Sequence, residues 1–126
     1  MMNVQELATI RRYNLPLKIV VLDNQYLGMV RQQQELFYAG RESEVDLSDN
    51  PDFAALARVF GIHALHIERA DQIRRGIETL FAYAGPMLLH VSIRRGDNVW
   101  PIVKPGGSNR DMLQPTSTSH TSGAAA

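Results

Sequence analysis

The sequence contains no cysteine, and this absence excludes disulfides and metal sites with thiolate ligands. Net charge is absent too: 13 Lys and Arg residues balance 13 Asp and Glu residues, so the charge does not indicate nucleic acid or an anionic membrane as a partner. The longest apolar runs, around 19–22 and 87–89, are far too short to span a bilayer. The N-terminus lacks the basic and then apolar pattern of a secretory signal, and we therefore expect a cytoplasmic location.

Runs of branched apolar residues alternate along the chain with segments of helical periodicity. The apolar runs predict β-strands at residues 18–22, 62–67 and 87–93. The periodic segments predict helices at 2–13, 29–37, 50–60 and 73–84. This alternation predicts an α/β fold in which helices flank a parallel sheet and the crossovers are right-handed.

Local signals refine this prediction at a few positions. The run at 18–22 is almost wholly apolar, so we expect both faces of that strand to be covered. Asn50 is expected to cap the third helix, with Pro51 at its first position and Gly61 at its end. Residues 114–126 are mainly Ser, Thr, Gly and Ala, and they predict a disordered tail after one domain that spans 1–113.

The end of the first strand is the best candidate for chemistry, because ligands of open parallel sheets bind beyond the carboxyl ends of the strands. The sequence there is DNQYLG, residues 23–28. The Asn24 amide and a nearby main-chain carbonyl are hard oxygen donors that suit Mg²⁺. Gly28 permits close approach of a ligand, and the helix that follows favours bound phosphate at its N-terminus. On local chemistry alone, the same residues are more often only a turn.

Longer motifs make the indication specific. The segments DNQYLGMVRQ (23–32) and NVWPIV (98–103) resemble the large subunit of acetolactate synthase (acetohydroxyacid synthase) nearly residue for residue. Shorter segments extend the resemblance over residues 1–113, namely 1–10, 15–19, 35–38, 50–53, 60–62, 85–86 and 105–107. The resemblance is to the C-terminal, thiamine-diphosphate-binding part of that subunit, and it implies the corresponding α/β fold, truncated on its N-terminal side.

The resemblance assigns roles to individual residues. In the family a Gly-Asp-Gly motif is followed, after a helix and a strand, by Asn-Asn or Asp-Asn. By this likeness Asn24 binds Mg²⁺ through its side chain and Tyr26 through its main-chain carbonyl, and the Mg²⁺ holds the diphosphate of the cofactor. Gly28, Met29 and Val30 match the segment that lines the cofactor pocket. The Gly-Asp-Gly half lies just before the segment that matches Met1, so we expect this chain to carry only part of the metal site.

Gln33 stands where many biosynthetic members carry a tryptophan that shapes the pocket for the second 2-keto acid. A polar, flexible side chain offers less apolar contact there. We therefore expect a weak preference for 2-ketobutyrate over pyruvate. Some members do carry glutamine at this place, so the change alone does not imply loss of function.

The family joins pyruvate to a second pyruvate or to 2-ketobutyrate on thiamine diphosphate, at the entry to branched-chain amino-acid biosynthesis. Its activating glutamate and most of its FAD site lie in other domains. The resemblance therefore implies an isolated chain without catalytic residues of its own and without activity. It also implies homo-oligomers or pairing with a large subunit, and association with a regulatory small subunit. The alternatives are another thiamine-diphosphate carboligase or oxidase, and a non-catalytic remnant that binds a full-length subunit.

Other polar residues have simpler interpretations. His63 and His66 are three apart on a strand, so we expect them on opposite faces and without a shared metal. His90 is expected to be a hydrogen-bonded core residue. Arg31 could reach the cofactor region or lie exposed on its helix, and the pair at 94–95 is expected to be solvated.

Overall fold

The computed structural model describes residues 2–115, and it divides into two compact units. The first unit contains residues 2–27 and 46–96, and the second contains 28–45 and 97–115. Most of the predicted tail at 114–126 lies outside the described residues. The prediction of one domain over 1–113 stays a prediction.

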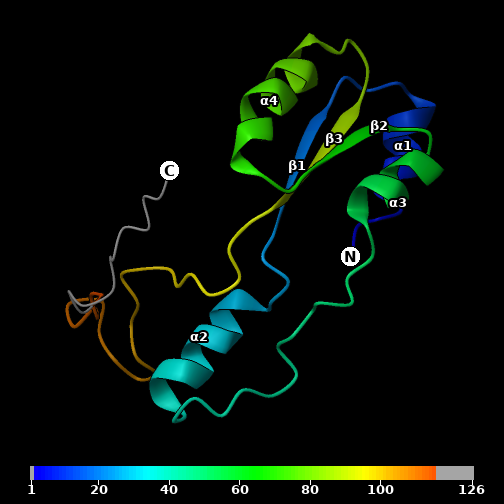
Figure 1. Cartoon of the computed structure of the whole chain (residues 1–126). Helices are drawn as coiled ribbons and strands as arrows, with labels where there is room; N and C mark the ends of the chain where they lie inside the picture. Colours follow the sequence, from blue (N-terminus) through cyan, green and yellow to red (C-terminus); the bar gives the residue numbers. More distant parts are fainter. Residues whose placement is uncertain (1, 116–126) are drawn as a thin grey trace. The chain divides into compact units, whose positions relative to one another are not determined.

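A three-stranded parallel sheet forms the centre of the first unit (Figure 1). Its strands are β1 (Lys18–Asp23), β2 (His63–Ile67) and β3 (Met87–Ser92), in the order β1-β3-β2. Both pairings involve β3, with Val21 opposite His90 on one side and His66 opposite His90 on the other. The predicted α/β fold with a parallel sheet is confirmed.

Helices cover the two faces of the sheet (Figure 1). On one face, α1 (Glu6–Arg12) and α3 (Phe53–Val59) pack in a core built from Ile10, Ala54, Ala57, Ile62, Ala64 and Leu88. On the other face, a 3₁₀ turn (Ala70–Gln72) leads into α4 (Ile73–Ala82), which packs in a second core of Ile67, Leu80, Met87 and Leu89. Alternate residues of β3 therefore contribute to opposite cores, as the pleat requires.

The edge strand β1 departs from the prediction that both of its faces would be covered. Val20 and Leu22, which point away from α1 and α3, are 50% and 64% exposed. The reason is that α4 packs against β2 and β3, and β1 has one neighbouring strand within the described residues. The apolar run at 18–22 therefore predicted the strand correctly, but the prediction that both faces of this strand are buried was wrong.

The start of α3 also differs from the prediction. Asp52, not Asn50, is the N-cap, and its Oδ1 accepts hydrogen bonds from the amides of Ala54 at 2.8 Å and Ala55 at 3.1 Å. Such a cap stabilises a helix by about 0.5–2 kcal/mol. Pro51 therefore precedes the helix. Gly61 follows the helix with φ +74°, which confirms the predicted stop.

The first turn of α4 passes very close to β2 at Gly76. A Cβ placed on Gly76 would lie 2.3 Å from Cδ1 and 3.3 Å from Cγ1 of Ile67, and 3.5 Å from Cδ1 of Leu89. A larger residue here would force the side chains of this core to shift, so packing, and not backbone conformation, favours glycine at this position.

The second unit is organised around α2 (Gly28–Phe37). Arg31 is 7% exposed and forms an ion pair with Glu35 at 3.0 Å and a hydrogen bond with Asn98. Gln32 is 2% exposed, and its side-chain amide donates to the carbonyl of Val99 at 2.8 Å and accepts from the amide of Val99 at 3.1 Å. The expectation that Arg31 could lie exposed is wrong, because the segment at 98–99 covers this face of the helix.

No helix among residues 2–115 combines the length and apolar character needed to cross a membrane.

Candidate functional site

The polar turn after β1 forms a pinned corner in the first unit. Asn24 Oδ1 accepts a hydrogen bond from the Tyr26 amide at 3.1 Å, and Asp23 Oδ1 accepts one from the Gln25 amide at 2.9 Å. The Gln25 carbonyl accepts from the amide of Leu47 at 2.9 Å. Gln25 has φ +56°, in the left-handed region that few residues enter without such support. This segment, residues 23–26, is called the β1 corner below.

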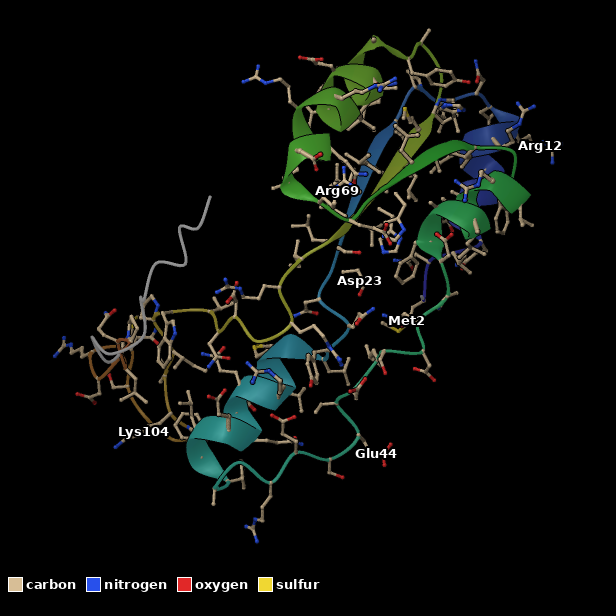
Figure 2. All side chains as sticks on the ribbon, in the orientation of Figure 1. Met2, Arg12, Asp23, Glu44, Arg69 and Lys104 are labelled. Atoms are coloured by element: carbon tan, nitrogen blue, oxygen red, sulfur yellow. The ribbon has the colours of Figure 1, made fainter. Side chains whose placement is uncertain are left out.

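The β1 corner stands where the prediction requires it. It follows the carboxyl end of a parallel strand and lies outside any helix. Figure 2 shows the labelled Asp23 where the chain leaves β1. Asn24 and Tyr26 are both half-buried, and each presents an oxygen of the type that Mg²⁺ prefers. An amide oxygen has two lone pairs, so the bond from Tyr26 leaves Asn24 able to accept a cation.

A second set of contacts, made by Asp46 and Arg95, supports Tyr26. Tyr26 pairs with Asp46 in an isolated antiparallel bridge, and Arg95 donates to Asp46 Oδ2 at 2.8 Å. The guanidinium of Arg95 also lies 4.5 Å from the centre of the Tyr26 ring. Hydrogen bonds from Ser48, followed by the bond from Arg95, lower the pKa of Asp46. The Arg95 side chain is 42% exposed, so it is solvated as expected, and it also supports the β1 corner through Asp46 and Tyr26.

His90 contacts the corner from the central strand. It is 4% exposed, and its Nε2 lies 3.2 Å from Oδ2 of Asp23, whose side chain is 10% exposed. Asp23 also accepts a weak bond from Asn50 Nδ2 at 3.4 Å. The prediction that His90 is a hydrogen-bonded core residue is confirmed.

His66 and Asp52 complete a group around His90. One potential ligand atom from each of Asp52, His66 and His90 lies within 4.8 Å of the others. The two imidazoles are stacked, however, with centroids 4.1 Å apart and planes 3° apart, so their in-plane lone pairs run parallel instead of converging on one ion. His66 Nε2 is bonded to Ser92 Oγ at 2.9 Å. This geometry is that of a stacked polar pair.

Two further features of this region concern Asp52, whose pKa is lowered, and His63, which lies on the same strand as His66. The hydrogen bond from the Ala55 amide, aided by those from Ala54 and by Arg58, lowers the pKa of Asp52 against the effect of desolvation. His63 points to the opposite face from His66, where it stacks on Tyr83 with centroids 4.8 Å apart. The predicted opposite orientation of the two histidines is thus confirmed.

The remaining predicted site residues lie on α2, in the second unit. Gly28 is the first residue of this helix. Met29 and Val30 are 69% and 44% exposed, and Gln33 is exposed as well. These side chains are available to a ligand, but their pocket roles stay predictions.

Comparison with known proteins identifies the family. Residues 1–91 match the model described as "Thiamine pyrophosphate enzyme, C-terminal TPP binding domain". The chain belongs to this family. This membership accounts for the parallel sheet and its flanking helices.

Two relatives of this thiamine pyrophosphate enzyme domain are acetolactate synthase large subunits. The chain is 60% identical over 114 residues to the acetolactate synthase isozyme 2 large subunit of Escherichia coli, a match that covers 90% of this chain and 21% of the relative. It is 43% identical over 114 residues to the acetolactate synthase large subunit of Parasynechococcus marenigrum, covering 90% of this chain and 18% of the relative. The chain thus spans about a fifth of the length of these curated relatives.

Two features of the domain were not foreseen from the sequence. One is the bond between His90 and Asp23, which depends on β1 lying beside β3. The other is the anchoring of the segment at 98–99 by Arg31 and Gln32. In both cases the sequence offered a hint, namely a polar residue in an apolar strand or on a helix. The partner of each polar residue could be identified only from the structure.

Proposed function

We propose that this chain is the cofactor-binding portion of an acetolactate synthase large subunit, and that Asn24 and Tyr26 hold Mg²⁺ against the diphosphate of thiamine diphosphate. The observation that carries the proposal is the β1 corner: an asparagine amide and a main-chain carbonyl two residues later, pinned by hydrogen bonds at the exit of a parallel strand. Gly28, Met29 and Val30 are proposed to line the pocket for the cofactor.

The donor set fits a magnesium diphosphate. Mg²⁺ prefers six oxygens and commonly takes only one or two from the protein, with phosphate and water filling the other positions. Asn24 and Tyr26 would supply a neutral amide and a neutral carbonyl. Asp23, directly beside them, has one oxygen turned to Gln25 and the other to His90, which leaves it as a support of the corner.

The proposed substrates are 2-keto acids: pyruvate with pyruvate, or pyruvate with 2-ketobutyrate. Bound thiamine diphosphate supplies the covalent chemistry of decarboxylation and carbon–carbon bond formation. This chain contributes binding and orientation of the cofactor. FAD, a homo-oligomeric partner and a regulatory small subunit are proposed for the complete enzyme, and a cytoplasmic location is proposed as well.

Calorimetric titration of this chain with thiamine diphosphate is expected to show binding that depends on Mg²⁺. Loss of a residue that only supports a metal ligand typically weakens metal affinity about 10- to 100-fold. Asn24→Ala removes a proposed ligand itself, so it should weaken the Mg²⁺-dependent affinity for thiamine diphosphate by at least that factor. Asn3→Ala, a change of the same residue type at an exposed site, should leave binding unchanged. None of these preparations should form acetolactate in a colorimetric acetoin assay.

The outcomes of this titration separate the alternatives. Binding that is equal in wild type and Asn24→Ala would contradict the assigned metal ligand. No binding by the wild type would favour a remnant that associates with a full-length subunit, and co-elution with the intact enzyme in size-exclusion chromatography would then support that alternative.

Gln33 is proposed to set the choice of the second substrate. In a complete large subunit with this sequence, mixed pyruvate and 2-ketobutyrate should give acetolactate and acetohydroxybutyrate without strong bias. Gln33→Trp should raise the proportion of acetohydroxybutyrate by about tenfold, because one methylene against an apolar wall is worth about 1–3 kcal/mol. Product ratios from competition experiments provide the measurement, and a strong preference for 2-ketobutyrate in the wild type would refute the proposal.

A further inference from the structure

The imidazole of His90 has an unusually fixed position for a side chain with no assigned role. His66 stacks against one face of the ring at 4.1 Å, and Phe53 meets it edge-on at 5.2 Å with the planes 82° apart. The side chain is 5% exposed. Rotation of the ring would displace neighbours on both sides, so its nitrogens are held in defined directions.

Those directions determine its hydrogen bonding. Nε2 faces Oδ2 of Asp23, which accepts when ionised. Nδ1 is buried, lies 3.7 Å from Oδ1 of Asp52, and has no hydrogen-bond partner among the described residues. The arrangement assigns the proton of a neutral imidazole to Nε2, where it is donated to Asp23.

Asp23 transmits this contact to the β1 corner. While Oδ2 faces His90, Oδ1 accepts from the Gln25 amide at 2.9 Å. Gln25 occupies the left-handed region and separates Asn24 from Tyr26. The orientation of one carboxylate therefore helps to fix the backbone between the two proposed metal ligands.

We propose that His90 is a positioning residue, which acts through Asp23 to hold the β1 corner in the shape that binds a magnesium diphosphate. The inference rests on the function proposed above for Asn24 and Tyr26. Residues that orient metal ligands in this indirect way typically change metal affinity by about 10- to 100-fold when they are replaced.

Two substitutions of His90 in the 126-residue chain test this role, and a third, at Asp23, follows below. His90→Leu removes the donor at similar volume, whereas His90→Gln places an amide donor where Nε2 stood. In His90→Leu, the Gln25 amide should exchange with solvent about tenfold faster, while the amides of Leu88 and Leu89 report global opening. Mg²⁺-dependent affinity for thiamine diphosphate should fall about 10- to 100-fold in His90→Leu and by less than about threefold in His90→Gln.

The tautomer provides a readout that a purely structural role would not affect. Long-range ¹H–¹⁵N spectra of the wild type should show the His90 proton on Nε2. Asp23→Asn keeps an acceptor for Gln25 and turns an NH₂ group towards His90, so the proton should shift to Nδ1. This comparison holds even if His90→Leu fails to fold.

The failures of the two proposals are distinguishable. If the wild type binds no cofactor, the metal assignment fails, while the Gln25 exchange rates and the tautomer still test the coupling of His90 to the corner. A wild-type tautomer protonated on Nδ1 would overturn the inference. So would a folded His90→Leu chain with unchanged Gln25 exchange and unchanged cofactor affinity.

Discussion

Replacing Leu89 with alanine is expected to lower the free energy of unfolding of the first unit by about 2–5 kcal/mol. Leu89 is 2% exposed and lies on the central strand β3, in the core that also contains Ile67, Leu80 and Met87. The loss has two parts. The variant no longer gains the free energy of burying the deleted side-chain carbons, and it leaves a cavity that the strands on either side cannot close. Since single domains are stable by only about 5–15 kcal/mol, the variant should be severely weakened.

Chemical denaturation followed by circular dichroism is the suitable measurement for Leu89→Ala. The only tryptophan of the sequence, Trp100, belongs to the second unit, so circular dichroism follows the helices and strands of the first unit more directly than fluorescence does. Leu22→Ala is the matched control, because Leu22 is 64% exposed on β1 and its loss should change stability by less than about 0.5 kcal/mol. Similar losses in the two variants would show that Leu89 is not part of a packed core.

Gly76→Ala is expected to destabilise the first unit by up to about 2 kcal/mol, although alanine is the better helix former. The new Cβ would lie 2.3 Å from Cδ1 of Ile67, a buried residue. Overpacking of this kind costs about 1–3 kcal/mol, which the gain of about 1 kcal/mol in helix propensity only partly offsets. The same denaturation experiment provides the measurement.

A double-mutant cycle separates the collision from other effects of Gly76→Ala. Ile67→Val deletes the Cδ1 methyl, so the double variant should be more stable than the sum of the two single losses predicts, by about 1 kcal/mol or more. Gly96→Ala is the control, because nothing lies within 4 Å of a Cβ at Gly96. Strict additivity in the cycle would contradict the proposed contact between α4 and β2.

The sequence predicted secondary structure where one local signal dominated. Branched apolar runs gave the strands, and Gly61 marked the end of α3 because its φ of +74° suits glycine. The cap of α3 was predicted two residues too early, at Asn50 instead of Asp52, since both residues are good caps and they stand on either side of Pro51. The residue before a proline is driven towards extended backbone, but this does not decide which of the two residues faces the first free amides. In the folded chain Ala54 and Ala57 pack in the core, and Asp52 is the residue that accepts from the amides of Ala54 and Ala55.

The candidate site was predictable to the extent that it is local. Asn24 and Tyr26 lie within one turn, and their place at the end of β1 follows from the strand itself. The contact between Asp23 and His90 depends on strand order, and alternation of strands and helices does not determine whether β1 lies beside β2 or β3. Arg31 was misjudged for a similar reason, because its partner Asn98 belongs to a distant segment.

The position of β3 has a consequence for how the chain folds as it leaves the ribosome. Both ladders of the sheet run through β3, which is the last of the three strands to be synthesised. Among the residues that the structure describes, β1 and β2 pair only with β3, so neither ladder can form before Met87–Ser92 is synthesised. Pairing across such long stretches of chain is intrinsically slow. The β1 corner therefore gains its support from His90 only after β3 has inserted between β1 and β2.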